Sequence, residues 1–340
     1  MPATIKDIAH QAGVSLSTVS RVVNGKALRY RISKDTEAKI MQVAKELHYS
    51  PNQLARGLRL KKTLLIGLVI PDISNPFFAH ITKRIQNLAH QKGYSLIVCD
   101  TDENLDLEIE HIDLLMSKGI DGLILMPVGQ ESKHLAPLIE RNFPLVLLDR
   151  CFEEIESISV LVDDYQGAFD AVSHIIERGH RRIAIIQGLP GTSTSSNRLR
   201  GYKDALLQKN IEIDADLIVG SDFRAENGYI ETKILLHVRN RPTALFTTSD
   251  LITLGALKAI DEENLAIPDD MSLVAFDDID FAPYLSSPLT TVSQPKMIMG
   301  EIAVKMLIDA IITHRVSAQK IVLKPQLIVR NSVRRLGDGR

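Results

Sequence analysis

Apolar positions between residues 64 and 295 form ten short runs rich in Val, Ile and Leu, separated by stretches with helical spacing of apolar residues. Near-continuous apolar strands that alternate with helices are typical of parallel sheets covered on both faces. Ten strands are too many for one sheet, so we predict an α/β core of two doubly wound parallel-sheet subdomains. The runs cover residues 64–71, 94–101, 121–127, 144–150, 158–164, 182–189, 216–222, 244–250, 272–278 and 289–295.

A different pattern marks the first fifty residues, where apolar side chains at helical spacing predict three short helices. The first covers residues 4–12, with Thr4 as a candidate N-cap. Gly13 ends it, Ser15 opens the second helix, and the third runs over about 34–47. Two short helices across a tight glycine turn, braced by a third, predict an all-α helix-turn-helix unit.

The second of these helices interleaves small hydroxyl side chains with valines around Arg21, in the run GVSLSTVSRVVNG. In a helix-turn-helix unit the second helix enters the major groove of DNA. Small hydroxyl groups permit a close approach and donate to phosphates or bases, and Arg21 can contact guanine O6 and N7 together. The alternative is that these Ser and Thr residues only cap and cover a small surface helix.

Charge is distributed unevenly along the chain. Residues 1–62 contain 12 Lys or Arg against 4 Asp or Glu, a net +8, so the remaining 278 residues carry −10 within a total of −2. A basic head on an acidic body is typical of a protein that binds a polyanion and has a separate second function.

Residues 50–62, SPNQLARGLRLKK, follow the head and contain about two turns of helix-compatible sequence. A helix this short rarely persists without a core, so we expect it to order only on a partner. Leu54 and Leu58 lie one turn apart, and in two adjacent copies a leucine here can wedge between base steps in the minor groove. The alternative is a plain basic linker.

The runs TIKDIAHQAGVSLSTVSRVVNG and YSPNQLARGLRLKKT resemble the LacI/GalR (lactose-repressor/galactose-repressor) family of bacterial transcription regulators. The likeness continues through IGLVIPDISNPFF, GHRRIAIIQG and SLVAFDDIDFAPYLSSPLTTVSQP to about residue 332. It implies that Leu16, Ser17 and Arg21 read bases, and that Leu58 is the wedging leucine. It implies phosphate contacts by Thr4, Thr18, Ser20 and Asn24, and a wider DNA-binding set that includes Ser15, Asn52, Leu54 and Ala55.

One segment departs from the family. The run NGKALRYRIS, residues 24–33, is about three residues longer than the usual loop and adds Arg29, Tyr30 and Arg31. It is either a longer solvent loop or a source of extra phosphate contacts beside the binding site.

Several predicted strands of the body end in polar or charged residues, including Asp72, Asp149, Asp163, Asp250 and Asp277. Ligands of parallel α/β sheets bind beyond the carboxyl ends of the strands, so these residues predict a cleft lined with groups that bind hydroxyls. An aromatic wall beside such groups is typical of a sugar site.

Phe77 and Phe78 are the candidates for that wall, although we expect at least one to pack in the core. By resemblance to the periplasmic sugar-binding fold, the effector cleft is lined by Asn75, Phe77, Phe78, Asp149, Arg150, Arg198, Phe223, Ser249, Asp277 and Gln294. Ser249 stands where relatives often carry asparagine, which leaves room for a bulkier ligand.

The resulting domain assignment places the helix-turn-helix domain at 1–49, a hinge at 50–62, an effector-binding core at 63–332 and a tail at 333–340. Within the core, the N-subdomain takes about 63–162 and 294–325, and the C-subdomain takes about 163–293 and a C-terminal strand. No leucine heptad follows residue 332, so a homodimer is expected. The resemblance implies a repressor that binds a pseudo-palindromic operator in double-stranded DNA and responds to a small effector, a sugar or sugar derivative.

Two other classes of protein fit less well. A solute-binding protein without a regulatory role has no use for a basic head, and the start MPATIKDIAH lacks the apolar core of an export signal, which favours a cytoplasmic protein without membrane spans. In an enzyme we would expect a nucleotide loop, but QGLPGTSTSSNR matches neither common pattern. We therefore expect no catalytic residues, cofactor or metal, and we expect Cys99 and Cys151 to be buried free thiols.

Overall fold

The computed structural model describes residues 3–49 and 62–337, and the chain divides into two compact units, Met1–Thr63 and Leu64–Arg340. Each unit is described by itself. The predicted hinge contacts of Asn52, Leu54, Ala55 and Leu58 lie outside the described residues. No helix among the described residues is both long and apolar enough to cross a membrane.

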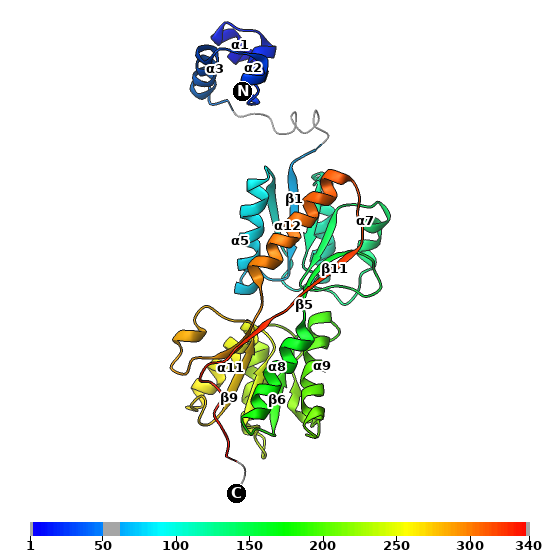
Figure 1. Ribbon diagram of the computed structural model, residues 1–340, viewed down its shortest axis with the longest axis vertical. Coiled ribbons are helices and arrows are strands. Elements are labelled where there is room, and N and C mark those ends of the chain that lie inside the picture. Colours follow the sequence, from blue (N-terminus) through cyan, green and yellow to red (C-terminus); the bar gives the residue numbers. More distant parts are fainter. Residues whose placement is uncertain (1–2, 50–61, 338–340) are drawn as a thin grey trace. The chain divides into compact units, whose positions relative to one another are not determined.

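The first unit confirms the three predicted helices, which are α1 (Ile5–Ala12), α2 (Leu16–Val23) and α3 (Lys34–Glu46), with a 3₁₀ turn η1 (Leu28–Tyr30) between the last two (Figure 1). Thr4 and Asp7 cap α1 reciprocally, which satisfies backbone N–H groups at its first turn. Gly13 ends α1 in the left-handed conformation, with φ 66°. Buried Ile8, Val19 and Ile40, one from each helix, join the three in a single small core.

The second unit contains two six-stranded sheets, which confirms the two-sheet prediction. All ten predicted strands form, and two more complete the sheets. The first sheet has the order β11-β5-β4-β3-β1-β2 and the second β12-β10-β9-β8-β6-β7; every pairing is parallel except that of β10 with β12. The strands of the first are β1 (Leu65–Ile70), β2 (Ser95–Asp100), β3 (Gly122–Leu125), β4 (Leu145–Leu148), β5 (Ile158–Val162) and β11 (Gln319–Leu323). Those of the second are β6 (Ile183–Ile186), β7 (Ile218–Val219), β8 (Ala244–Thr247), β9 (Ser272–Phe276), β10 (Thr290–Ser293) and β12 (Gln326–Ile328).

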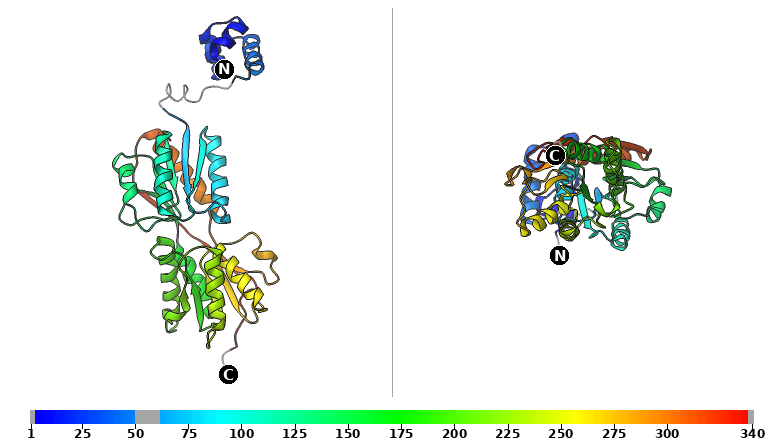
Figure 2. Two further views of the ribbon diagram at one scale, coloured as in Figure 1. Left: turned by 180° about the vertical axis from the view of Figure 1, so that it is seen from behind. Right: turned by 90° about the horizontal axis from the view of Figure 1, so that it is seen from below.

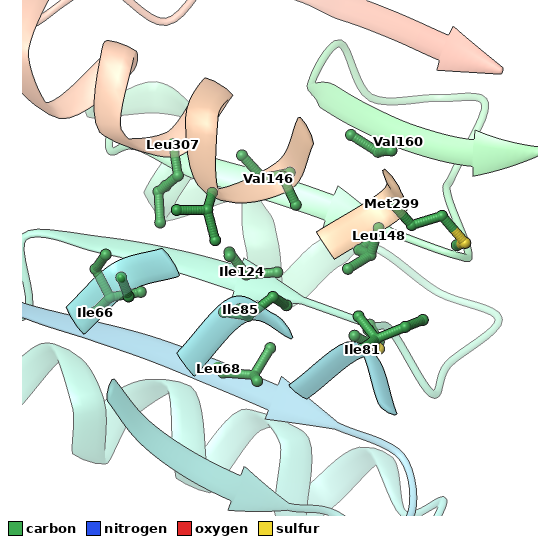
Figure 3. Close-up of a cluster of buried hydrophobic side chains, with 14 of the residues drawn as sticks. Ile66, Leu68, Ile81, Ile85, Ile124, Val146, Leu148, Val160, Met299 and Leu307 are labelled. Carbon is green, nitrogen blue, oxygen red and sulfur yellow. The ribbon is translucent and has the colours of Figure 1, made fainter. Parts of the chain in front are cut away.

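Helices cover both faces of each sheet (Figure 2). Successive residues of β1 alternate between two cores, with Ile66 and Leu68 facing α5 and α12 while Val69 faces α6 and α7. Figure 3 shows Ile81 and Ile85 of α5 meeting Met299 and Leu307 of α12 over these strands. The helices are α5 (Pro76–Gln91), α6 (Leu105–Ser117), α7 (Ala136–Glu140), α8 (Asp164–Glu177), α9 (Ser193–Gln208), α10 (Ala225–His237), α11 (Asp250–Glu262) and α12 (Lys296–Thr313).

The chain passes between the two sheets three times: after β5, after β10, and between β11 and β12. We call the part built on the first sheet the N-lobe and the part built on the second sheet the C-lobe. The segment from residue 333, expected to be a tail, begins with packed chain: Val333 is buried in the C-lobe core and the Leu336 N–H donates to the Arg178 carbonyl. Cys99 is buried as expected, whereas Cys151 is only half-buried, and both are free thiols.

Close helix packing in the C-lobe predicts an unequal response of two helical glycines. A Cβ at Gly255 of α11 would lie 1.9 Å from the Ala225 carbonyl oxygen of α10, whereas one at Gly300 of α12 would lie 3.3 Å from Arg84 Cβ and Cγ and 3.4 Å from the Ile81 carbonyl oxygen. We expect Gly255→Ala to lower the free energy of unfolding by about 1–3 kcal/mol. For the control, Gly300→Ala, the gain in helix propensity of about 1 kcal/mol offsets a mild contact, so the free energy of unfolding should change by less than about 1 kcal/mol. Denaturant unfolding measures both, and equal responses would contradict the packing argument.

Candidate functional site

The exposed side of α2 carries the residues predicted to read DNA. Leu16 is 48% exposed, and Ser17 and Arg21 are also exposed. Ser15 has a structural task as well, because its Oγ accepts from the Thr18 N–H at 3.1 Å and bonds the Ser17 hydroxyl at 2.8 Å. Ser15 is therefore the N-cap of the helix, so the capping interpretation holds for this residue.

Three of the four predicted phosphate contacts are half-buried. Thr18, Ser20 and Asn24 have intermediate exposure, while Thr4 is exposed. The Asn24 side-chain amide donates to the Ser20 carbonyl and so closes the C-terminal end of α2. Thr18 and Ser20 lie on α2, Asn24 lies at its C-terminal end, and Thr4 is the N-cap of α1. The roles of all four toward DNA stay predictions.

In the second unit, one cavity lies where the carboxyl ends of the two sheets face each other. A water-sized molecule can reach only about 20 Å³ of it, within about 300 Å³ of unfilled space that includes open solvent. The structure brings all ten predicted effector residues together around this cavity. Its lining is Asn75, Phe77, Phe78, Asp149, Arg150, Thr194, Arg198, Phe223, Ser249, Asp277 and Gln294.

Two aspartates occupy matching places in the two lobes. Asp149 follows β4 and Asp277 follows β9, and their N–H groups donate to Val160 and Val292, each across to the next strand at 3.0 Å. Both are left-handed, with φ 69° and 79°, a conformation that costs most residues energy and that aspartate tolerates better. This turn ends each strand and places a carboxylate at the cavity.

Arg150 connects the cavity to the N-lobe framework. Its two terminal nitrogens donate to both Glu103 carboxylate oxygens, at 3.0 and 2.9 Å. The guanidinium also lies over the Phe223 ring of the C-lobe, 4.7 Å from the ring centroid. A buried arginine held in this way is compensated by a charge partner and an aromatic face.

Arg198 of α9 is held on the opposite wall. Its Nε and Nη2 both lie 2.7 Å from Asp164 Oδ1, and its Nη1 donates to the Thr248 carbonyl at 2.6 Å. The guanidinium stacks on the Phe276 ring, 3.8 Å from the centroid. The side chain is therefore fixed before any ligand binds.

Asn75 and the two phenylalanines form the apolar side. Asn75 caps α5, because its side-chain oxygen accepts from the Phe77 N–H at 2.8 Å. Phe77 and Phe78 meet edge to face with centroids 5.2 Å apart, and both also belong to the N-lobe core. The expectation that at least one would pack in the core is confirmed, and both rings also reach the cavity.

Three buried polar atoms of the lining have no hydrogen-bond partner within the described part of the chain: Arg150 Nε, Thr194 Oγ1 and Gln294 Oε1. A buried polar atom without a partner costs about 1–3 kcal/mol. These atoms are the groups that a hydrogen-bonding ligand would satisfy. Among residues 3–49 and 62–337, no group of three or more His, Cys, Asp or Glu side chains is placed to hold a metal ion.

Burial raises the pKa of the carboxyl groups here. The pKa of Asp149 rises to about 6, although Arg150 and Arg198 lower it. The pKa of Asp164 rises to about 7 for the same reason, against the pull of Arg198. Burial and the nearby Asp277 raise the pKa of Asp250 to about 7. The lining itself carries two carboxyl groups, Asp149 and Asp277, and two guanidinium groups, Arg150 and Arg198.

The prediction from strand ends was wrong for three of its five aspartates and missed other residues. Asp250 does not line the cavity, because its carboxylate accepts from the Leu251 and Phe77 N–H groups. Asp163 caps α8, with its carboxylate accepting from the Gln166 N–H, and Asp72 lies in an outer groove with Ser74 and Asp102. Asp72 and Asp163 therefore also lie outside the lining. Thr194 and the arginine partner Asp164 were missed because both lie in the first turn of a helix, where a sequence pattern shows a helix start and not a ligand.

Residues 4–52 match the family described as bacterial regulatory proteins, lacI family, and residues 172–333 match a periplasmic binding protein-like domain. The chain is 38% identical over 334 residues to the HTH-type transcriptional repressor PurR of Proteus mirabilis (strain HI4320), covering 97% of each chain. It is also 38% identical over 333 residues to PurR of Serratia proteamaculans (strain 568), again covering 97% of each.

Two solved structures show the same architecture. The lac repressor dimer bound to operator and the anti-inducer ONPF has a TM-score of 0.86 at 28% identity, covering 98% of this chain and 100% of that chain. The complex of the transcriptional regulator CelR with cellobiose has a TM-score of 0.72 at 29% identity, covering 97% and 99%.

A helix-turn-helix head in one chain with a two-lobed binding core defines the class of DNA-binding transcriptional regulators controlled by a small molecule. The chain belongs to the lacI family of bacterial regulatory proteins. The family resemblance and the fold class predicted from the sequence are confirmed.

The raised pKa of Asp250 predicts a pH dependence of stability. The folded protein holds the Asp250 proton up to about pH 7, whereas the carboxyl of an unfolded chain loses it near 3.8. The carboxyl therefore stabilises the fold below about pH 4, and this contribution is lost as pH rises through about 7. The melting temperature of Asp250→Asn, relative to the unsubstituted protein, should rise between about pH 5 and about pH 8.

A matched control is Asp214→Asn. The hydrogen bond from Arg182 lowers the pKa of Asp214, so this carboxyl stays ionised over that range and its difference from the unsubstituted protein should stay constant. A constant difference for Asp250→Asn as well would contradict the raised pKa.

Proposed function

We propose that this protein is a homodimeric transcriptional repressor whose two heads bind the halves of a pseudo-palindromic operator, and whose affinity for that operator is set by an uncharged, polyhydroxylated small molecule such as a sugar. The observation that carries the proposal is the pairing, in one chain, of an exposed α2 bearing Ser17 and Arg21 with a cavity between two lobes that is lined by polar and aromatic side chains.

The DNA-binding half is supported by electrostatics and by exposure. The +8 charge of residues 1–62 attracts phosphate, and this part of the affinity should depend strongly on salt. Arg21 carries an exposed planar guanidinium near the end of α2, suited to a guanine edge in the major groove. A hinge at residues 50–62, with Leu58 wedged into the minor groove, stays a prediction.

The effector-binding half is supported by the chemistry of the lining. Asp149, Asp277 and Gln294 offer acceptors for hydroxyl groups, and Phe77 and Phe78 offer a surface for C–H groups. The two arginines already have carboxylate partners, so they leave no free positive charge for a phosphate. Cellobiose in the CelR complex, a protein with the same fold, agrees with this class of ligand.

Coupling between the two halves follows from the two-sided cavity. Asp250 Oδ2 of the C-lobe accepts from the Phe77 N–H of the N-lobe at 3.3 Å, and the Cys151 N–H of the N-lobe donates to Ser193 Oγ of the C-lobe at 3.2 Å. A ligand held by both lobes stabilises this arrangement over an open one. It shifts DNA affinity by the difference in its own affinity for the two arrangements, of order 1–3 kcal/mol.

The dimer rests on the lac repressor dimer bound to operator, the structural neighbour with a TM-score of 0.86. A solute-binding protein without a regulatory role would leave the basic head unexplained. The protein carries no enzymatic activity in this proposal, and it acts in the bacterial cytoplasm, where its DNA target lies.

The first experiment tests DNA recognition. Full-length protein selects duplexes from a random-sequence library, and binding of the selected duplex is measured against salt concentration. Affinity should fall steeply with salt, by a log–log slope of about −0.9 for each phosphate contact. Arg21→Ala should weaken binding about 5- to 100-fold by loss of one bidentate base contact. Lys258→Ala, an exposed change on α11, is the control and should have no effect. Failure to select any sequence, or a flat salt response, would overturn the proposal.

The second experiment tests the cavity. A thermal-shift screen of monosaccharides, disaccharides and sugar phosphates identifies a ligand, because a molecule that binds the folded state raises its melting temperature. Thr194→Val should then weaken binding about two- to tenfold, the worth of one neutral hydrogen bond. The control is Thr232→Val on α10, whose buried hydroxyl also lacks a partner but lies outside the lining. Equal effects of the two variants, or binding by phosphates alone, would contradict this assignment.

A further inference from the structure

The connection between α2 and α3 is a built element of the head. Ala27 is buried and Ile32 packs against the head core, so both ends of the extra segment are anchored. The Lys26 N–H donates to the Arg21 carbonyl at 2.8 Å, and the Ile32 N–H donates to the Ala27 carbonyl at 3.0 Å. Between these anchors the chain makes the single turn η1, which ends at Arg31 with a left-handed φ of 50°. A loose solvent loop would not need this bonding.

The turn brings an aromatic ring to the arginine of the reading helix. The Arg21 guanidinium carbon lies 4.1 Å from the centroid of the Tyr30 ring. Such a pair at an exposed site contributes about 0.5–1 kcal/mol. A contact of this kind also restricts where the guanidinium can move, without using its N–H groups as hydrogen-bond donors. The N–H groups of a guanidinium are the donors that make two parallel hydrogen bonds to a guanine.

The rest of the turn has the chemistry of a DNA-facing surface. Lys26, Arg29 and Arg31 are exposed, and residues 25–32 contain no acidic side chain. Leu28, at the start of η1, is 92% exposed, an apolar side chain left almost entirely in water. Cationic side chains suit phosphates, and an apolar contact suits sugars or the thymine methyl group.

We propose that residues 25–32 form a second element of the DNA interface, in which Tyr30 is a positioning residue that sets base specificity by holding the Arg21 guanidinium, while Arg29 and Arg31 contact phosphates beside the base that Arg21 reads. The inference rests on the proposed function, because it requires that Arg21 contacts a base. It separates two tasks within one short turn: specificity from the ring, and sequence-independent affinity from the cations.

The experiment is a double-mutant cycle on full-length protein, with the duplex that the unsubstituted protein selects from a random library as the probe. Tyr30→Ala should weaken binding about two- to fivefold, in line with one exposed cation–π pair. It should also reduce the preference for guanine at the position where Arg21→Ala loses it. In the Arg21→Ala background, Tyr30→Ala should have no further effect, because coupled residues are not additive. Tyr30→Phe keeps the ring and should restore both affinity and preference.

Arg29→Ala supplies the contrast. It should weaken binding to selected and unselected duplexes alike and make the salt slope shallower by about 0.9, the value of one phosphate contact. Equal losses from Tyr30→Ala in both backgrounds, or an unchanged guanine preference, would overturn the role of Tyr30. An unchanged salt slope for Arg29→Ala would overturn the phosphate contact.

The failure of this inference can be told apart from the failure of the proposed function. If the unsubstituted protein selects no sequence, the proposed function itself fails. If it selects a sequence normally and the variants do not respond, only the inference fails. Circular dichroism of each variant checks that the head stays helical.

Discussion

The central constraint on this core is that charge is buried where two parallel sheets end. Arg150 and Arg198 are almost inaccessible to solvent, and each survives there because a carboxylate and an aromatic ring hold it. Leaving one partner of such a pair buried and alone costs about 3–5 kcal/mol. These ion pairs therefore stabilise charged side chains at the cavity. They also neutralise the positive charge of both arginines, which would otherwise attract anions. The selectivity proposed for the site, hydroxyls rather than phosphates, follows from this charge balance.

The same arrangement makes the cavity depend on both lobes. Arg150 belongs to the N-lobe and stacks on Phe223 of the C-lobe, and Asp250 of the C-lobe accepts a hydrogen bond from the N-lobe backbone at Phe77. Three chain crossings connect the lobes, so a change in their closure moves segments of both. In the proposed function, a ligand that completes the unpartnered hydrogen bonds on both sides stabilises the closed arrangement of the two lobes, and this is how it controls DNA affinity.

In the head, by contrast, the constraint is the stability of three short helices. Its helices are too short to persist alone, so side-chain caps at Thr4 and Ser15 and a core of buried aliphatic residues hold them in place. The exposed side of α2, which is predicted to contact DNA, can then carry side chains such as Ser17 and Arg21 that contribute little to the core. In this chain the turn η1 places the Tyr30 ring against the Arg21 guanidinium. The longer connection between α2 and α3 therefore supplies a contact to an exposed residue of α2.

Local patterns were sufficient for much of this molecule. Apolar runs predicted ten of the twelve strands, and helical spacing predicted the three head helices. Family resemblance predicted ten residues that all line one cavity. These predictions succeeded because periodicity and sequence motifs are properties of residues that are neighbours along the chain. Tertiary structure decided the rest. Whether Asp163 or Asp164 contacts Arg198 depends on where α8 begins. The direction of the Asp149 and Asp277 carboxylates depends on the left-handed backbone conformation of these two residues. The edge strand β11 and the Tyr30–Arg21 pair depend on segments brought together by packing, and such contacts between distant segments leave no periodic trace along the chain.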